Sequence, residues 1–314
     1  MRVLVSGGSG LIGSALREAL ERAGQEVVRL RHAPGVAAED LAGQARPGEV
    51  LWNWEAGAID ATALRDFDAV VHLAGENVAG RWTARRKARI RDSRVIGTRM
   101  LADTLSRLDG KPGVLVTASG INYYGNRGAE ELDESSPPGG GFLADVCRDW
   151  EGATEPAARA GIRVVHTRFG MVLSSRGGAL GKMLPLFRKG LGGKLGSGRQ
   201  YVSWVSLRDA VRTIRFLFEH EDISGPVNVT APQPVTNRDL TDSLARVLKR
   251  PAFLPAPAFA LRLTLGQMAD EMLLASMRVL PRRLRDAGFV FKDAFIDKAL
   301  TRAIKREKPV QADG

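Results

Sequence analysis

A glycine-rich loop near the start of the chain constrains its fold more than any other feature. Gly7, Gly10 and Gly13 are spaced by three residues and follow a short apolar run at residues 3–5. Residues 11–23 come next and place apolar side chains at three- and four-residue intervals, the spacing of an amphipathic helix. A strand, a glycine turn and a helix in this order predict the first βαβ unit of a dinucleotide-binding domain.

We expect each part of this loop to have a separate role in holding a cofactor. Gly7 would permit the tight turn, Gly10 would let the backbone approach a pyrophosphate, and Gly13 would allow the helix to pack closely. Leu11 and Ile12 would begin the helix, whose free N-terminal amides stabilise phosphate charge. A glycine turn without a ligand is the alternative.

The second predicted strand, at residues 27–30, indicates which dinucleotide binds. A carboxylate at its end would accept hydrogen bonds from the adenosine ribose of NAD, but the chain has Arg31 and no acid there. An arginine can instead pair with the 2′-phosphate of NADP. We therefore predict NADP as the cofactor and Arg31 as its phosphate ligand, with Arg29 as the second choice. In the alternative, both arginines are solvated.

Short apolar runs alternate with helical patterns through the first half of the chain. They predict strands at residues 3–5, 27–30, 50–52, 69–73, 114–117 and 164–167. This alternation is typical of an α/β fold, here a doubly wound parallel sheet of the Rossmann type. Glycine- and proline-rich segments replace the pattern beyond residue 175. We predict an NADP-binding Rossmann domain at 1–175 and a smaller mixed substrate-binding lobe at 176–314.

The charge of the chain limits its partners without choosing one. A formal net charge of +11 fits phosphate-rich small molecules, nucleic acid or an anionic membrane surface. We expect an anionic small-molecule substrate and rank nucleic acid below it. The apolar runs are shorter than the roughly 18 residues of a membrane helix, so no membrane partner is expected. The single cysteine, Cys147, excludes an internal disulfide and fits a reducing, cytoplasmic location.

Residues 81–99 carry the main charge anomaly, with eight Lys and Arg residues against one acid. Apolar residues at helical spacing predict an amphipathic helix here, and they are Ile96, Met100, Leu101, Leu105 and Leu108. The arginines form either a solvated face or a phosphate site. In the second case we expect Arg94 and Arg99 to lie near the cofactor.

The end of the strand at 69–73 is expected to form the other side of the cofactor site. Leu73, Ala74 and Gly75 follow one another there, and small residues let the chain pass the ribose and phosphates. His72 is expected to pack within the strand. The histidines show no metal-ligand spacing, so we predict no metal.

Several separated segments, in the right order, together resemble one known group of proteins. They are residues 7–13, 73–77, 95–99, 123–125, 150–151 and 196–198, followed by Trp204. The chain is similar to the atypical NAD-dependent epimerase/dehydratase-like subgroup of the extended short-chain dehydrogenase/reductases. Residues 252–300 look like that subgroup's C-terminal domain of unknown function. The resemblance implies a hydride-transferring oxidoreductase or sugar-nucleotide epimerase, and relatives often dimerise through helices.

The chain departs from this resemblance at the catalytic pair. Active members use Tyr-x-x-x-Lys, in which the lysine and the cofactor ribose lower the tyrosine pKa. With Glu151 as the reference position, the pair falls on Leu143 and Cys147. Residues 142–147 hold neither tyrosine nor lysine, so an unusual acid or base is needed.

Other residues are therefore our candidates for catalysis and substrate binding. Ser119 is the counterpart of the family's usual serine, Tyr124 could supply a phenol, and Glu76 follows a strand end where catalytic groups collect. The candidates for substrate binding are Tyr123, Lys194, Arg199 and Trp204. Of these, Trp204 is expected to offer a stacking surface. A packed loop around the tyrosines and a flexible surface loop near residue 194 are the alternatives.

Two functions follow from these patterns. The first is an NADP-dependent oxidoreductase or epimerase-like enzyme that acts on an anionic or nucleotide-linked small molecule. The second is a non-catalytic NADP-binding sensor or regulatory protein, since some members of the subgroup carry a cell-division-inhibitor label.

Overall fold

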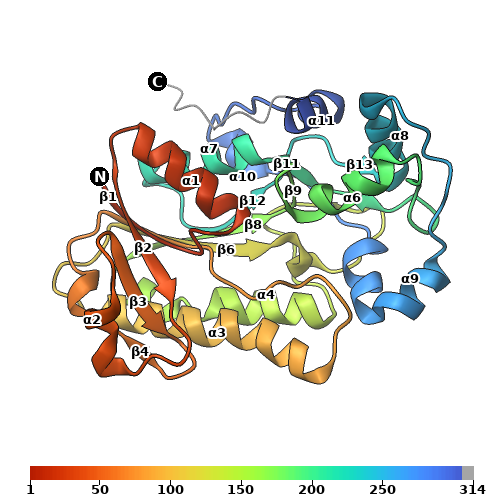
Figure 1. The fold of residues 1–314 in the computed structure, drawn as a ribbon. Coiled ribbons are helices and arrows are strands. Elements are labelled where there is room, and N and C mark those ends of the chain that lie inside the picture. Colours follow the sequence, from red (N-terminus) through yellow and green to blue (C-terminus); the bar gives the residue numbers. More distant parts are fainter. Residues whose placement is uncertain (306–314) are drawn as a thin grey trace.

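The computed structural model describes residues 1–305 and is built around one eight-stranded sheet (Figure 1). The strand order is β12-β8-β6-β5-β1-β2-β3-β4, and only the β3–β4 pair is antiparallel. These strands are β1 (Arg2–Ser6), β2 (Glu26–His32), β3 (Glu49–Asn53), β4 (Ala58–Ile59), β5 (Ala69–His72), β6 (Val114–Gly120), β8 (Arg163–Phe169) and β12 (Gly225–Val229). All six predicted strands are confirmed as members of this sheet.

Helices cover both faces of the sheet, and short strand pairs complete the second lobe. The helices are α1 (Leu11–Arg22), α2 (Leu41–Gln44), α3 (Ala84–Ser106), α4 (Phe142–Gly152), α5 (Glu155–Arg159), α6 (Gly178–Arg188), α7 (Leu207–Glu219), α8 (Asn237–Leu248), α9 (Ala258–Leu265), α10 (Arg282–Asp286) and α11 (Ile296–Lys305). The short strands are β7 (Glu131–Leu132), β9 (Met171–Leu173), β10 (Tyr201–Val202), β11 (Trp204–Ser206), β13 (Val235–Thr236) and β14 (Arg278–Val279).

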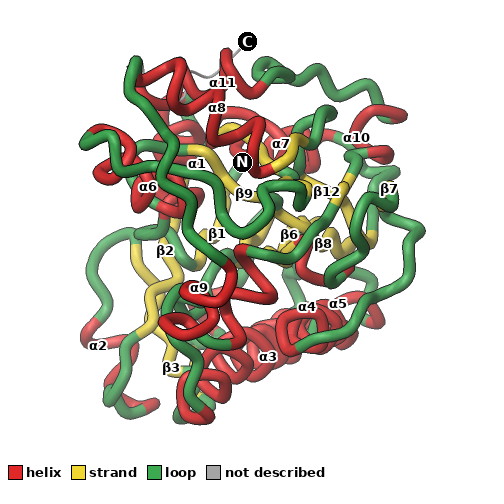
Figure 2. Tube along the Cα trace, turned by 90° about the vertical axis from the view of Figure 1, so that its right-hand side faces the viewer, coloured by secondary structure: helices red, strands yellow, loops and turns green. Residues whose placement is uncertain are grey.

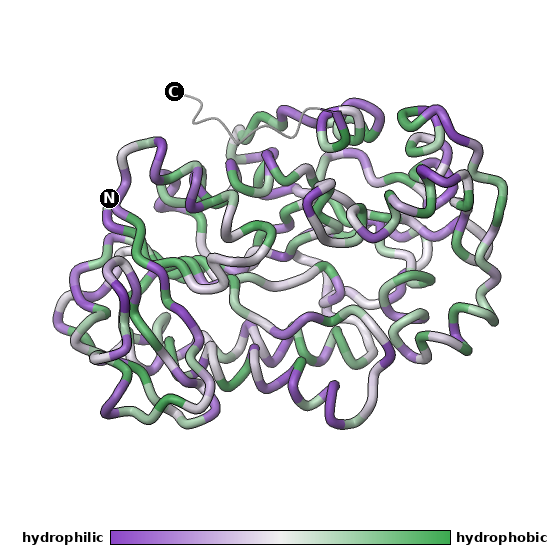
Figure 3. The backbone as a smooth tube through the Cα atoms, viewed as in Figure 1, coloured by the Kyte–Doolittle hydropathy of each residue, from purple (hydrophilic) through white to green (hydrophobic). Residues whose placement is uncertain are grey.

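The sheet is the middle of three layers, with α1 and α7 on one face and α3, α4 and α5 on the other (Figures 1 and 2). Successive side chains of a strand point to opposite faces. Val3 and Val5 therefore join the core under α1 and α7, whereas Leu4 joins the core under α3. Because both faces are covered, β1, β5 and β6 each contain a run of three apolar residues, at 3–5, 69–71 and 114–116 (Figure 3).

The second lobe has a core of its own between α6, α8 and α11. Leu184, Leu244 and Leu300 meet there and are almost fully buried. No described helix is both long and apolar enough to cross a membrane.

The lobe is less separate than the sequence predicts. Residues 204–229 return from it to the Rossmann sheet, where α7 packs against α1 and β12 pairs with β8. The expectation that everything beyond residue 175 lies outside the sheet is therefore wrong for this stretch, and residues 306–314 lie outside the described part. Ile96 is predicted to lie on the apolar face of α3. This prediction is wrong, because its side chain is 45% exposed.

Candidate functional site

The candidate site lies where the strand order reverses, between the carboxyl ends of β1 and β5. The chain leaves β1 into α1 above the sheet and leaves β5 toward α3 below it (Figure 1). Such a reversal opens a crevice between the two connections, which is where ligands bind in open α/β sheets. The glycine loop at 7–13 and the segment at 73–76 form its two sides.

The glycine loop is too tightly packed for side chains at two of its positions. Gly7 has a φ of +67°, and a Cβ there would lie 2.6 Å from the carbonyl carbon of Leu73. A Cβ on Gly13 would lie 2.3 Å from the carbonyl oxygen of Gly7. Helix α1 has no side-chain cap and no acid in its first turn, so its N-terminal amides are left for an anion. These features fit the pyrophosphate of a dinucleotide.

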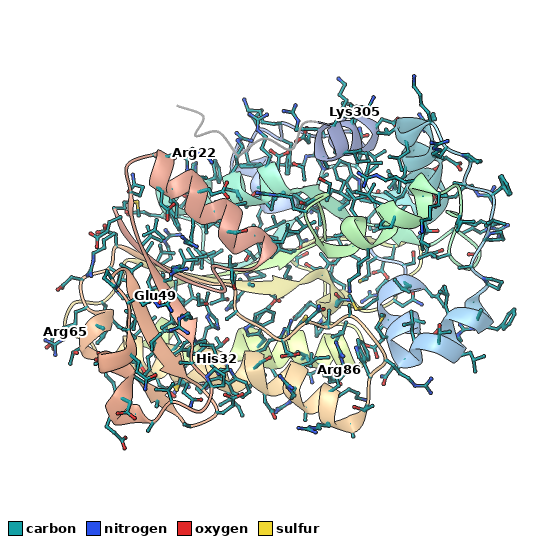
Figure 4. All side chains as sticks on the ribbon, in the orientation of Figure 1. Arg22, His32, Glu49, Arg65, Arg86 and Lys305 are labelled. Atoms are coloured by element: carbon teal, nitrogen blue, oxygen red, sulfur yellow. The ribbon has the colours of Figure 1, made fainter. Side chains whose placement is uncertain are left out.

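Arg29 and Arg31 share a carboxylate partner on the neighbouring strand β3. Arg31 Nε donates to Glu49 Oε2 at 3.1 Å, and Arg29 Nη2 donates to Glu49 Oε1. The Glu49 side chain is 2% exposed, whereas that of Arg31 is 46% exposed; Figure 4 labels Glu49. Within residues 1–305, the acid that contacts these arginines is thus buried beside them, and Arg31 stays accessible to a ligand.

Helix α3 brings one of its two predicted arginines to the site. The guanidinium of Arg94 lies against Gly75, with its Cζ 3.0 Å from where a Cβ would be, and donates to the carbonyl of Glu76 at 3.0 Å. Arg99 instead donates to the carbonyl of Gly152 at 3.3 Å. Gly152 is the last residue of α4, about 15 Å along that helix from the site end. Arg99 thus contacts the C-terminal end of α4, where a cation is favourable, and its role as a cofactor ligand stays a prediction.

Glu76 also lies at the rim of the crevice, but its carboxylate faces α3. Its Oε2 accepts a hydrogen bond from Arg89 at 3.2 Å, and its side chain is 34% exposed. The geometry therefore favours the sequence alternative, in which this acid is a partner of the nearby arginines.

Ser119 lies at the carboxyl end of β6 and is tied to a buried ion pair. Its Oγ donates to Glu151 Oε1 at 2.7 Å. Glu151 in turn accepts two hydrogen bonds from Arg168, from Nε at 2.8 Å and from Nη2 at 2.7 Å. Because its proton is committed to Glu151, Ser119 presents only oxygen lone pairs to a ligand and can accept, for example, from a hydroxyl.

The two neighbouring tyrosines extend the same network. The Tyr124 hydroxyl donates to Asn228 at 2.7 Å and accepts from Arg168 at 2.9 Å, and the residue is fully buried. Burial raises the pKa of Tyr124 to about 12. Tyr124 is thus held in a buried hydrogen-bond network, and its role as a catalytic acid or base stays a prediction. Tyr123 is half-buried, with the Arg168 guanidinium 3.5 Å from its ring centre.

Leu143 and Cys147 lie on α4, and both are buried. Burial, with the nearby charge of Glu151, raises the pKa of Cys147 to about 11. The thiol is thus neutral near pH 7. It cannot replace the positive charge of the lysine in the Tyr-x-x-x-Lys pair. Cys147 is thus a buried thiol on α4.

The C-terminal segment closes the start of α4. Glu271 accepts hydrogen bonds from the backbone amides of Phe142 at 3.0 Å and Leu143 at 2.8 Å, and its own carbonyl accepts from Asn122 at 3.2 Å. A carboxylate at a helix N-terminus is favourable. Residues 128 to 149 positions apart in the sequence therefore meet at the start of α4.

The three predicted substrate ligands of the second lobe have different surroundings. Arg199 is exposed and Lys194 is half-buried, and both belong to the loop between α6 and β10. Trp204 is 0% exposed, and its indole donates to the carbonyl of Gln233 at 3.1 Å. The prediction that Trp204 offers a stacking surface is therefore wrong, because the ring is part of the lobe's core.

His72 lies under the floor of the crevice, and its packing within β5 is confirmed. Ser6 Oγ accepts from the amides of Leu73 and Ala74, so its proton goes to His72 Nδ1 at 2.6 Å. The imidazole then carries its proton on Nε2, which lies 3.0 Å from Thr98 Oγ1. Burial lowers the pKa of His72 to about 4, which means that the folded protein holds it neutral.

This histidine predicts an acid-sensitive fold. Between pH 6.5 and 4 the unfolded chain binds a proton that the folded chain excludes, so the free energy of unfolding should fall by about 3 kcal/mol as the pH drops. His72→Gln should lack this part of the pH dependence. Urea unfolding of both proteins at pH 7, 6, 5 and 4 measures it, and equal pH slopes would contradict the assignment.

Sequence analysis missed four residues that build this site, namely Glu49, Arg168, Asn122 and Glu271. Glu49 had a usable signal, because an acid begins the buried strand next to the two arginines of β2. The other three residues gave no such signal in the sequence, because their contacts join residues 17 to 149 positions apart.

Comparisons with known proteins identify the family of this chain. The sequence model of the NAD dependent epimerase/dehydratase family matches residues 3–230, so the chain belongs to that family. A domain of unknown function matches residues 256–303, which confirms the resemblance seen in the tail. An epimerase family protein of Mycobacterium bovis is 45% identical over 306 residues, 97% of this chain and 98% of the relative.

A human relative and two solved structures extend the comparison. The human epimerase family protein SDR39U1 is 33% identical over 304 residues, 96% of this chain and 98% of that protein. The crystal structure of its isoform 2 with NADPH has a TM-score of 0.87 at 32% identity and covers 98% of this chain and 100% of the human one. The UDP-glucose 4-epimerase of Thermus thermophilus, in complex with NAD, has a TM-score of 0.73 at 21% identity over 96% and 98% of the two chains, and shares the fold.

Proposed function

We propose that this protein binds NADP(H) between β1 and β5 and acts as an oxidoreductase or epimerase-like enzyme on an anionic or nucleotide-linked small molecule. The arginine pair held by buried Glu49 carries the choice of NADP, because it occupies the place of the carboxylate in an NAD site. The human relative's structure with NADPH supports the same choice. Bound nicotinamide would supply the hydride acceptor or donor.

The chain's own residues would bind and orient the substrate. Ser119 is proposed to accept a hydrogen bond from a substrate hydroxyl, because its own proton is held by Glu151. Lys194 and Arg199 are proposed to bind the anionic part of the substrate from the second lobe. A cytoplasmic location, a homodimer and a low rank for nucleic acid stay predictions.

The substitution Arg31→Ala tests whether the site prefers NADPH to NADH. We expect NADPH to bind about 10- to 100-fold more weakly and NADH to be almost unaffected, because a hydrogen bond between charged groups contributes about 1.5–3 kcal/mol. Fluorescence titration with both nucleotides measures this. The exposed Arg65, labelled away from Glu49 and His32 in Figure 4, provides the control Arg65→Ala. Stronger binding of NADH than NADPH to the wild type would contradict an NADP site.

A non-catalytic NADP sensor is the second candidate, favoured by the buried Leu143 and Cys147. Ser119→Ala and Glu76→Gln separate it from the enzyme, with Gly10→Asp as the variant that blocks the cofactor. If the first two keep biological activity and only Gly10→Asp loses it, sensing is supported. If Ser119→Ala keeps NADPH affinity but stops hydride transfer from NADPH to a carbonyl substrate, the enzyme is supported.

A further inference from the structure

Exposed apolar side chains gather at one end of the second lobe. Ten large hydrophobic residues are exposed among the described residues, and six of them belong to this end. They are Leu186 (54%), Leu191 (51%), Phe253 (71%), Leu254 (45%), Phe259 (72%) and Leu263 (75%), and we call them the apolar edge. Exposed apolar groups that cluster in this way mark an interaction surface.

The apolar edge is formed by two segments that hydrogen-bond to each other. Leu254 N donates to the carbonyl of Gly192 at 3.1 Å, and Ala256 N donates to the carbonyl of Lys194 at 2.9 Å. Helix α9 follows directly, and none of its eight residues is buried although most are apolar. Figure 1 shows α9 at the periphery of the molecule, away from the central sheet.

The same two segments are strongly basic. Residues 182–199 and 246–262 together hold nine Lys and Arg residues and no Asp or Glu. Two of the nine have carboxylate partners elsewhere, Arg246 with Asp297 and Arg262 with Asp270. The segment that leads into α3 adjoins this surface as well, because Arg81 donates to the carbonyl of Leu263 at 2.9 Å.

We propose that the apolar edge docks on an anionic lipid bilayer, with phenylalanine and leucine side chains in the boundary between headgroups and acyl chains and the surrounding cations on lipid phosphates. A surface with apolar groups inside a basic rim has the chemistry of interfacial membrane binding, in which both contributions are needed. Nucleic acid would satisfy the cations but leave the aliphatic leucines uncovered. This proposal concerns contact with a membrane surface, whereas the expectation of no membrane partner rested on the absence of a spanning segment.

Vesicle co-sedimentation of the full chain tests this surface. We expect binding to vesicles of phosphatidylcholine with 30% phosphatidylglycerol, little binding to pure phosphatidylcholine, and weakening as salt rises. Phe253→Ser/Phe259→Ser/Leu263→Ser should reduce the bound fraction at least tenfold. The matched control is Val290→Ser/Phe295→Ser, two residues that are 65% and 52% exposed outside the apolar edge.

The other outcomes are equally informative. Failure of the wild type to sediment with anionic vesicles, or a triple variant that binds as well as the wild type, overturns the proposal. Gel filtration that shows a dimer lost in the triple variant, without vesicle binding, assigns the edge to a second copy instead. Unchanged thermal unfolding and NADPH affinity of the triple variant exclude misfolding as the cause of lost binding.

Discussion

Gly13→Ala should weaken NADPH binding by at least 100-fold. The added Cβ would lie 2.3 Å from the Gly7 carbonyl oxygen and 2.9 Å from the Gly8 Cα, so the loop must move. Overpacking of this kind costs about 1–3 kcal/mol of stability. NADPH binding should also weaken, because the displaced loop carries the amides that face the pyrophosphate. A 100-fold loss of affinity corresponds to about 2.7 kcal/mol of binding free energy.

NADPH fluorescence titration and thermal unfolding together measure this prediction. Gly152→Ala is the matched control, since it adds the same methyl group at a glycine with nothing within 4 Å. In thermal unfolding, Gly10→Ala should destabilise the protein less than Gly13→Ala, because its Cβ would lie 3.2 Å from the nearest protein atom. Wild-type affinity in Gly13→Ala would show that the loop does not hold the cofactor.

The sheet could be predicted because its signals are local. A buried parallel strand is commonly a short apolar run, and such runs located β1, β2, β3, β5, β6 and β8. β12 escaped prediction because Pro226 and Asn228 interrupt its apolar pattern. Proline is tolerated there since β12 is the edge strand of the sheet.

The candidate site could be predicted only in part, for a related reason. The glycine loop is a local pattern, whereas the partner of Arg31 depends on the register between β2 and β3. Trp204 shows the same limit, because its position after a glycine-rich loop says nothing of the core that α6, α8 and α11 form around it. Residue type and spacing therefore predict the glycine loop that would hold the cofactor. Only the tertiary packing shows which polar side chains have partners within the protein and which are accessible to a ligand.

The buried pair Arg168–Glu151 gives the second large prediction. Glu151→Gln should lower the free energy of unfolding by about 3–5 kcal/mol, because it leaves the Arg168 charge buried without a counterion. The Arg168 side chain is 3% exposed and that of Glu151 is 11% exposed. Urea unfolding at pH 7 measures the change. Ser119 should lose its fixed orientation in the same variant, since Glu151 accepts its proton.

A double variant separates the charge from the packing. Glu151→Gln/Arg168→Gln removes both charges, so it should be destabilised by less than the sum of the two single variants. Glu155→Gln is the control, because it breaks the pair of Glu155 with Arg159, whose side chains are 51% and 77% exposed; such surface pairs contribute about 0–1 kcal/mol. If Glu151→Gln proves no more destabilising than this control, Arg168 must have another counterion or reach water. In that case Glu151 would be free to act as a base on Ser119 rather than as the fixed support of its hydroxyl.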